Sequence, residues 1–353
     1  MKLCYWTVFP NTYQTALLEA LRAHGVDVVA CYFKFYDAGR TAMGWKTRPL
    51  QAWEFQLRSP AEARRRIPDY DERVQSVGAF FNLTYWRVLL RCVVKGLPWI
   101  AVTEGSRGRW YMRPLLRCFA LLADRYARHV FCIGQRALDQ FREAGVRASK
   151  LSWFSYVTPS LPEGLPPRDE HLTFVFAGSL TERKAVDVMA EAFRRVHAEC
   201  PHVRFLVVGD GPMRPLLERC EGVELAGGVA QEDVYRCIAR GHVMLLVSRY
   251  DPWGVSLMEG AMCSQALIGS GQVGAAQDLI KDGVNGFLVG AGDVPALAEA
   301  MLRYARAPEL AEAHGWSARK SAERTSGPIL AKCLMEMLGC GVDAAQEKGG
   351  VNG

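Results

Sequence analysis

Short apolar runs alternate with stretches of helical spacing from the start of the chain. Residues 2–9 and 27–33 predict two strands, and residues 13–24 between them carry apolar side chains at helical spacing. Gly25 follows this helix, at the position where glycine commonly ends one. The order strand, helix, strand predicts a right-handed crossover and therefore a parallel sheet.

The rest of the first half continues this rhythm after a long interruption. Residues 34–75 are rich in aromatic and basic residues and lack a regular hydrophobic pattern, so they are predicted to be irregular. A long irregular segment in a compact domain is typically functional or mobile. Further strands are predicted at 80–83, 99–103 and 130–133, with helices from about 85 and over 110–128.

The second half predicts a complete α/β series of its own. Helices are expected between its apolar runs, and 293–306 and 309–338 are also predicted to be helical. Six strands alternating with helices indicate a doubly wound parallel sheet. The six runs are 174–177, 205–208, 223–225, 243–247, 266–269 and 286–289.

A proline-rich stretch separates the two halves. Residues 158–170 contain four prolines among polar residues, which is typical of a linker. The chain is therefore predicted to form two Rossmann-like doubly wound domains that face a cleft. The expected divisions are an N-terminal domain (1–157), the linker (158–170), a C-terminal domain (171–320), a terminal helix (321–338) and a disordered tail (339–353).

Composition supports a globular, reducing-compartment protein. The 353 residues are 50% hydrophobic and 23% charged, which excludes a disordered chain, and no stretch approaches the roughly 20 apolar residues of a membrane span. The 11 cysteines are scattered, with no C-x-x-C pair and no histidine at metal-ligand spacing. We therefore expect a cytoplasmic protein without a metal site.

Charge is unevenly distributed between the halves. Residues 1–165 hold 24 Lys and Arg against 13 Asp and Glu. This excess favours an anionic neighbour, although a merely solvated basic face fits equally well. Residues 110–128 interleave bulky apolar residues with arginines, and Arg107 and Arg109 precede them, so the segment is a candidate for peripheral contact with an anionic membrane. The alternative is a core helix with a solvated rim. No recognised nucleic-acid-binding module is present.

The strand predicted at 243–247 leads into the most informative loop of the chain. The loop carries Asp251, and the helix that follows it carries Glu259. A strand, loop and helix of this kind present backbone N–H groups and a helix N-terminus to an anion. Two carboxylates beside such a site are poor phosphate ligands and good acceptors of hydroxyl hydrogen bonds. The expected ligand therefore carries both phosphates and hydroxyls, as a sugar nucleotide does.

Two further loops follow predicted strands of the second half. Gly178 allows close backbone approach, and Lys184 opens the next helix within reach of a diphosphate. Arg183 is either a second cation for that group or a surface residue. Gly209 and Gly211 form a G-x-G-P turn, which by itself is a weak signal.

These motifs together resemble family 4 of the glycosyltransferases, also described as glycosyl transferases group 1. Asp251-x7-Glu259, followed by Gly-Ala-Met, is similar to the E-x7-E signature of that family, with Asp in place of the first Glu. The resemblance covers residues 174–289 well, and the first half only in its order of strands and helices. It implies the two-domain GT-B fold and retaining transfer of a hexose without a cofactor or a metal, the donor being a nucleoside diphosphate sugar.

The resemblance also implies roles for individual residues. Lys184 stabilises the leaving diphosphate beside Gly178 and Ser179, where many members have Arg for Ser179. Glu259 accepts hydrogen bonds from the ribose, and Asp251 accepts them from the donor sugar. The remaining implied contacts are the base loop of Gly209 and Gly211, and the phosphate contacts of Trp253, Gly254, Val255 and Ser256.

Other positions depart from the family. Ala185 follows Lys184 where glycine is usual, and the loop at residues 9–12 lacks the Gly-Gly that many members carry. Glu104 ends a predicted strand near the position that is often His, where it is either a catalytic or acceptor-binding group or a solvent-facing carboxylate.

We therefore expect a UDP- or GDP-linked donor and a saccharide or lipid-linked acceptor. The expected setting is bacterial surface-polysaccharide synthesis at the inner face of the cytoplasmic membrane. Two alternatives remain open: a sugar-nucleotide epimerase on the same fold, and a non-catalytic nucleotide-binding or scaffold relative.

Overall fold

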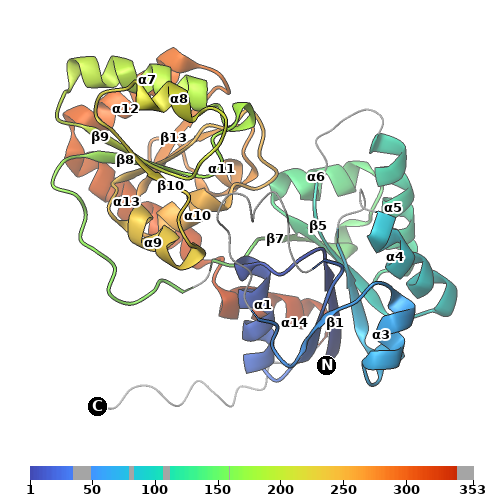
Figure 1. Ribbon diagram of the computed structural model, residues 1–353. Coiled ribbons are helices and arrows are strands. Elements are labelled where there is room, and N and C mark those ends of the chain that lie inside the picture. Colours follow the sequence, from blue (N-terminus) through green and yellow to red (C-terminus); the bar gives the residue numbers. More distant parts are fainter. Residues whose placement is uncertain (35–48, 79–82, 106–111, 159, 340–353) are drawn as a thin grey trace, which may run out of the picture.

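The computed structural model describes residues 1–34, 49–78, 83–105, 112–158 and 160–339. These residues form two α/β domains, each built on a parallel sheet, that lie side by side (Figure 1). The predicted pair of doubly wound parallel-sheet domains is confirmed. Within the described part of the chain, no helix is long and apolar enough to span a membrane.

The N-terminal sheet has seven strands in the order β3-β2-β1-β4-β5-β6-β7, and every neighbouring pair is parallel. Its strands are β1 (Lys2–Thr7), β2 (Asp27–Tyr32), β3 (Glu54–Gln56), β4 (Val74–Val77), β5 (Trp99–Glu104), β6 (Val130–Ile133) and β7 (Leu151–Phe154). The helices of this half are α1 (Thr12–Ala23), α3 (Pro60–Arg66), α4 (Leu83–Lys95), α5 (Arg113–Tyr126) and α6 (Gln135–Glu143), with 3-10 turns at Tyr70–Glu72 and Ala148–Lys150.

Successive side chains of β1 point alternately into two hydrophobic cores, one on each face of this sheet. Leu3 and Tyr5 belong to the core beneath α1, whereas Cys4 and Trp6 belong to the core beneath α4 and α5. Successive side chains of a strand point to opposite faces, so a strand buried on both faces reads as a continuous apolar run. This is why β1 could be predicted from its sequence alone.

The C-terminal sheet has six strands in the order β10-β9-β8-β11-β12-β13, again parallel. Its strands are β8 (Thr173–Ala177), β9 (Arg204–Val208), β10 (Val223–Gly227), β11 (Val243–Leu246), β12 (Ala266–Ser270) and β13 (Gly286–Val289). Its helices are α7 (Val186–Glu199), α8 (Arg214–Glu218), α9 (Gln231–Ala239), α10 (Val255–Met262), α11 (Gly274–Leu279), α12 (Val294–Arg306) and α13 (Pro308–Glu323), with a 3-10 turn at Glu182–Lys184.

The helix α14 (Gly327–Met337) returns to the N-terminal domain and packs on α1. A Cβ atom built on Gly327 would lie 3.2 Å from the Cβ of Ala20, so the two helices approach closely at a small residue. Leu330 and Leu334 of α14 are buried in the same core as Leu17 of α1. Figure 1 shows α14 beside α1, far along the sequence from the strands that it covers.

Apart from α14, the two domains are also joined by polar contacts around Asp278. Asp278 of α11 accepts hydrogen bonds from the indole N–H of Trp153 at 2.6 Å and from the backbone N–H of Gln135 at 3.0 Å. Gln135 opens α6, so a carboxylate of the second domain caps a helix of the first. Burial raises the pKa of Asp278 above its ordinary value, although these two hydrogen bonds oppose the shift. Arg324 donates to the backbone oxygen of Asp278 and covers the ring of Trp153.

Several predictions for the first half are wrong. The strand β4 at Val74–Val77 was not predicted; of the strand expected at 80–83, residue 83 instead begins α4, and 80–82 lie outside the described residues. The segment 34–75 is not irregular throughout, because it contains β3, α3 and the beginning of β4, while 35–48 are not described. The strand β7 was not predicted.

Helix boundaries also differ from expectation. The helix expected over 110–128 is α5 (Arg113–Tyr126), and Arg107 and Arg109 lie outside the described residues. The helical region expected at 309–338 is broken between α13 and α14. Residues 160–170 of the expected linker contain neither helix nor strand, and the tail predicted to be disordered lies outside the described residues from 340 onward.

Candidate active site

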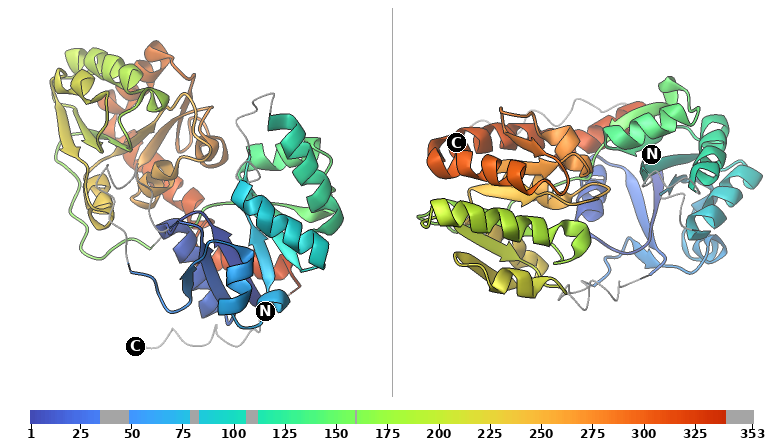
Figure 2. Two further views of the ribbon diagram at one scale, coloured as in Figure 1. Left: turned by 45° about the vertical axis from the view of Figure 1, so that its right-hand side comes forward. Right: turned by 90° about the horizontal axis from the view of Figure 1, so that it is seen from above.

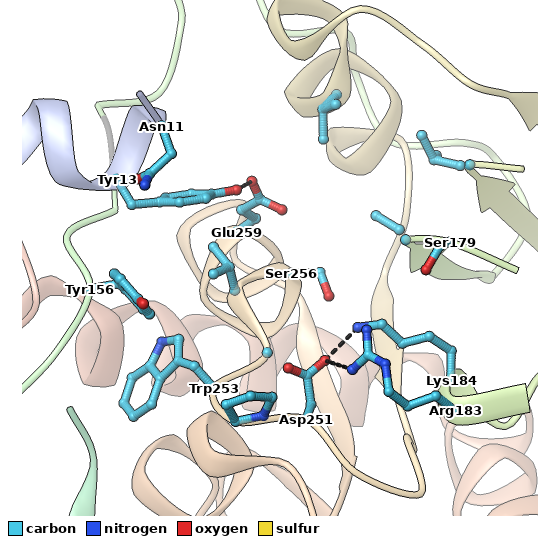
Figure 3. A pocket seen from close by; sticks show the side chains of 18 of the residues that line it. Asn11, Tyr13, Tyr156, Ser179, Arg183, Lys184, Asp251, Trp253, Ser256 and Glu259 are labelled. Atoms are coloured by element: carbon cyan, nitrogen blue, oxygen red, sulfur yellow. Dashed lines mark hydrogen bonds and ion pairs between the residues drawn. The ribbon is translucent and has the colours of Figure 1, made fainter. Parts of the chain in front are cut away.

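A cavity of about 580 Å³ lies between the two domains and is lined by residues of both. Four of its lining residues come from the N-terminal half of the chain, and Figure 3 shows three of them, Asn11, Tyr13 and Tyr156, opposite the loops of the second domain. The sequence-predicted residues that line it are Glu104, Gly178, Ser179, Arg183, Lys184, Gly209, Asp251, Trp253, Gly254, Val255, Ser256 and Glu259. Gly211 is not among the lining residues.

The N-terminus of α10 forms the floor of this cavity. Gly254 precedes the helix with φ of 94°, in the left-handed region that glycine adopts without strain. A Cβ atom at this position would lie 2.5 Å from Val273 and 2.6 Å from Leu246. Glycine is therefore required here, and the backbone N–H groups of Val255 and Ser256 stand at the positive end of the helix dipole.

Two cations meet one carboxylate at the side of the cavity. Lys184 ends the 3-10 turn Glu182–Lys184, is 9% exposed, and donates a hydrogen bond from Nζ to Oδ2 of Asp251. Arg183 Nη1 lies 3.6 Å from the same oxygen (Figure 3). Because two positive charges face one negative charge, the cluster carries a net charge of +1 next to the helix N-terminus. This is a favourable place for an anion.

Ala185 adopts the backbone conformation that glycine would give. Its φ is 56°, in the left-handed region that residues with a side chain seldom occupy. The turn that directs Lys184 into the cavity is therefore kept, although the sequence departs from the family at this position.

The loops after β8 and β9 lie against one another. The backbone N–H of Gly178 donates to the oxygen of Val208 at 2.9 Å, and a Cβ atom on Gly209 would overlap the carbonyl oxygen of Gly178. Only glycine allows this approach, which exposes backbone along the cavity wall. Asp210 also lines the cavity, and its side chain accepts a hydrogen bond from the backbone N–H of Gly211 at 2.7 Å within the same turn.

Glu259 is a buried carboxyl in the middle of α10. It is 4% exposed, and its Oε1 accepts a hydrogen bond from the hydroxyl of Tyr13 at 2.8 Å. Burial raises the pKa of Glu259 from its ordinary 4.5 to about 7, and the bond from Tyr13 opposes this shift. Glu259 can therefore exchange a proton near neutral pH.

Glu104 ends β5 on the opposite wall and is bonded rather than solvent-facing. The hydroxyl of Tyr156 donates to its Oε1 at 2.6 Å. Burial raises the pKa of Glu104, the negative charge of Asp251 adds to the increase, and the bond from Tyr156 opposes it. The two carboxyl groups are close enough to influence each other electrostatically.

Among the lining residues that were not predicted from the sequence, Tyr13 and Tyr156 hydrogen-bond to carboxyl groups of the cavity. Tyr13 lies in the first turn of α1, which Asn11 caps by accepting from the N–H of Gln14 at 2.9 Å. Tyr156 follows β7, a strand that was itself not predicted. A phenol at a helix start or a strand end carries no motif, so neither residue had a sequence signal.

In the described part of the chain, no three His, Cys, Asp or Glu side chains are grouped so that they could hold a metal ion. The groups that the cavity offers to a ligand are cationic side chains, backbone N–H groups, carboxyl groups and phenols. Such a set fits a ligand with an anionic end and several hydroxyls.

Comparison with known proteins relates the chain to a known family. Residues 171–306 match the glycosyl transferases group 1. The chain is 28% identical over 193 residues to an alpha-D-kanosaminyltransferase from Streptomyces kanamyceticus, covering 53% of this chain and 47% of that protein. It is 29% identical over 143 residues to the N-acetyl-alpha-D-glucosaminyl L-malate synthase of Bacillus anthracis, covering 39% of this chain and 37% of that protein. The matched segments thus span about half of these relatives or less.

Solved structures resemble the whole chain. The Anabaena protein HepE in complex with UDP superimposes with a TM-score of 0.74 and 17% identity, covering 96% of this chain and all of that one. Sucrose-phosphate synthase from Thermosynechococcus elongatus gives a TM-score of 0.75 and 16% identity, covering 96% and 98%. The predicted resemblance to the glycosyl transferases group 1 is confirmed over residues 171–306, and the predicted GT-B fold is confirmed for the two domains.

Proposed function

We propose that this chain is a retaining glycosyltransferase that moves a hexose from a nucleoside diphosphate sugar to an acceptor hydroxyl. The observation that carries the proposal is the convergence of Lys184, Arg183 and the N-terminus of α10 on one cavity that also contains Glu259. The relatives named as glycosyltransferases support the reaction class, and the complex of HepE with UDP supports a uridine nucleotide as donor.

In this proposal the diphosphate replaces Asp251 as the partner of Lys184. Asp251 now holds the ammonium group within the cavity, where a lysine without a counter-charge would be costly. When the diphosphate binds, its oxygens form ion pairs with Lys184 and Arg183. The carboxylate of Asp251 then accepts hydrogen bonds from the hydroxyls of the donor sugar. Lys184, Arg183 and the helix N-terminus then stabilise the charge that develops on the leaving group, so the proposal requires no metal and no cofactor.

Bond formation and bond cleavage take place on one face of the sugar. The acceptor oxygen bonds to the anomeric carbon while the bond from that carbon to the diphosphate oxygen breaks. The acceptor proton passes to the departing phosphate oxygen. Retention follows because the nucleophile enters on the face that the leaving group vacates.

The acceptor side of the proposal rests on the N-terminal wall of the cavity. Glu104 at the end of β5 and Tyr156 after β7 provide a carboxyl group and a phenol that are hydrogen-bonded to each other. Such a pair suits a hydroxyl-bearing acceptor, and we propose a saccharide, free or lipid-linked.

A surface of exposed apolar and basic side chains in the same domain supports the lipid-linked form. We define the α4–α5 surface as the outward side of these two helices, which pack side by side through Trp86 and Phe119 (Figure 2). Asp124 is the single acidic residue in the described sequence of the two helices. The exposed residues of the surface are Arg87, Leu90, Val94 and Lys95 of α4, and Arg113, Pro114, Arg117, Cys118, Leu121, Arg125 and Tyr126 of α5.

Exposed apolar and basic side chains together fit an anionic bilayer. Leu90, Val94 and Leu121 expose 52%, 76% and 69% of their surface, which favours shallow insertion among lipid headgroups. Both helices begin at the sheet edge where β5 ends at Glu104, so a glycan could enter the cavity while its lipid stays in the membrane. The matching cellular setting is the inner face of the cytoplasmic membrane, during bacterial surface-polysaccharide synthesis.

Nucleotide binding is the first test. Thermal unfolding is followed with UDP, GDP and ADP and with their common sugars, for the wild type and for Glu259→Ala. A nucleotide at about 100 times its dissociation constant should add roughly 2.7 kcal/mol to the free energy of unfolding. We expect UDP to give a selective shift that is lost in Glu259→Ala.

The control removes a carboxylate of the same domain outside the cavity. Glu299 lies on the exposed side of α12, so Glu299→Ala should retain the full shift. If none of the nucleotides or nucleotide sugars shifts the wild type, the proposed function is wrong. Transfer of radiolabelled glucose from UDP-glucose to a panel of saccharides and lipid-linked saccharides then separates a transferase from an epimerase, which releases product without an acceptor.

A further inference from the structure

The hydrogen bond between Tyr13 and Glu259 joins the two domains inside the cavity. Tyr13 lies in the first turn of α1, and Glu259 lies in α10, 246 positions later in the sequence. Figure 3 shows the phenol of Tyr13 reaching across to the carboxyl group of Glu259. Asn11 caps α1 by accepting from the backbone N–H of Gln14, which fixes the backbone of the turn that carries Tyr13.

The partner of Glu259 is chemically similar to the proposed ligand. A phenol O–H and a ribose O–H both donate to a carboxyl oxygen at about 2.7–2.8 Å. Among the described residues, Tyr13 is the only side chain that hydrogen-bonds the carboxyl group of Glu259. Glu259 is 4% exposed, and Tyr13 lines the same cavity through which a ligand must approach.

We propose that Tyr13 holds, in the nucleotide-free protein, the place on Glu259 that a ribose hydroxyl takes in the complex. Nucleotide binding then displaces the phenol and breaks a bond between the domains. Tyr13 is therefore a specificity-determining residue of the donor site supplied by the opposite domain, and it opposes nucleotide binding. The inference rests on the proposed function, since it assumes that Glu259 binds the ribose.

The contact has a clear benefit for the empty protein. A carboxyl group buried in α10 without a hydrogen-bond donor would carry the full cost of its desolvation. Tyr13 reduces that cost until a ligand arrives. Binding consequently exchanges one hydrogen bond for another, and a ligand without a matching hydroxyl cannot complete the exchange.

A thermodynamic comparison of two tyrosines tests the inference. Tyr13→Phe removes the contact. Tyr32→Phe removes a similar bond in the same domain but outside the cavity, where the hydroxyl of Tyr32 donates to Glu54 at 2.6 Å. Binding of UDP, and of GDP and ADP in parallel, is measured by calorimetry, and thermal unfolding is followed with and without saturating nucleotide.

The two variants should behave differently. Tyr13→Phe should bind UDP about three- to tenfold more tightly than the wild type, because the competing hydrogen bond is gone. Its melting temperature should be lower than that of the wild type without nucleotide and equal to it at saturation. Tyr32→Phe should bind UDP with wild-type affinity, and its loss of melting temperature should persist at saturation.

The results distinguish failure of the Tyr13 inference from failure of the proposed function. If the wild type binds UDP but Tyr13→Phe binds it equally or more weakly, or keeps its deficit at saturation, the inference is wrong and the proposed function stands. If no nucleotide binds the wild type, both are wrong.

Discussion

The two walls of the cavity differ in chemistry. The C-terminal wall offers two cations, the N-terminus of α10 and glycine loops that expose backbone. The N-terminal wall offers no cationic lining residue within the described part of the chain. Its lining side chains are Asn11, Tyr13, Glu104 and Tyr156.

This difference separates two recognition problems. A diphosphate is the same in every donor, and backbone N–H groups with fixed cations recognise it wherever the loops allow close approach. An acceptor varies in its hydroxyl pattern, which phenols, amides and carboxyl groups can match in many combinations. The comparison therefore predicts that changes in the C-terminal wall affect every reaction of the enzyme, whereas changes in the N-terminal wall depend on the acceptor.

The largest effect is expected for Lys184→Ala. Loss of the cation that faces the leaving group should lower turnover by about 100- to 1000-fold with every acceptor. Transfer from UDP-glucose measures it, with circular dichroism to verify the fold. Lys281→Ala, which removes an exposed lysine of the same domain, is the control and should keep wild-type turnover. An acceptor-dependent loss in Lys184→Ala would remove the distinction between the walls.

Charge reversal on the α4–α5 surface should come next. Each basic residue near an anionic bilayer contributes about 1 kcal/mol, so the triple variant Arg87→Glu, Arg117→Glu and Arg125→Glu should weaken binding to phosphatidylglycerol vesicles by roughly 100-fold or more. Vesicle co-sedimentation measures this, with neutral phosphatidylcholine vesicles for comparison.

The matched control reverses three exposed arginines of the other domain, Arg195, Arg303 and Arg306. It should bind vesicles as the wild type does, and UDP affinity should be unchanged in both triple variants. Equal losses in the two variants would show that overall charge, and not the α4–α5 surface, attracts the membrane.

Glu104→Gln should give a smaller and acceptor-specific effect. The amide keeps the shape of the side chain but removes its negative charge, so kcat/KM for the acceptor should fall by about tenfold while the affinity for UDP stays the same. Kinetics with two acceptors of different hydroxyl pattern should give unequal losses. A weakened UDP affinity would instead assign Glu104 to the donor site.

The last prediction concerns the pH dependence of stability through Glu259. Its pKa is about 7 when folded and near 4.5 when unfolded, so the folded protein binds the extra proton between these values. The free energy of unfolding of the wild type therefore decreases as the pH rises through this window, by up to roughly 1 kcal/mol per pH unit. Glu259→Gln cannot titrate at this position. The difference in free energy of unfolding between the two proteins, measured in urea from pH 4.5 to 8, should show this slope and level off above pH 7; a flat difference would contradict it.

Sequence predicted the C-terminal domain better than the N-terminal one, and the reason is physical. The strands of the second sheet are short apolar runs, and the groups that bind a diphosphate are local features of single loops. In the first sheet, β4 contains Gln75 and Ser76, both fully buried, which breaks the apolar pattern. Gln75 is tolerated there because its side chain accepts from Trp6 of the neighbouring strand β1 at 2.9 Å, and the two residues are too far apart in sequence for a local pattern to reveal this contact.

The candidate site shows the same division. Lys184, Asp251 and Glu259 lie in recognisable motifs and were predicted, and all three line the cavity. Tyr13 and Tyr156 carry no such motif, and they line the cavity only because the two domains meet there. Contacts between domains depend on the orientation of whole sheets, and local sequence does not encode that orientation. Glu104 was found because the end of a parallel strand is a place where ligands bind.

The packing of α14 on α1 has a consequence for how this protein is made. The ribosome synthesises α1 first, but the helix that covers it emerges only after the entire second domain. Domains usually fold as units while synthesis proceeds, yet here the first one waits with Leu17 and its neighbours uncovered. A nascent chain stalled before Gly327 should therefore expose an apolar face that chaperones can bind, even though both of its sheets have already been synthesised.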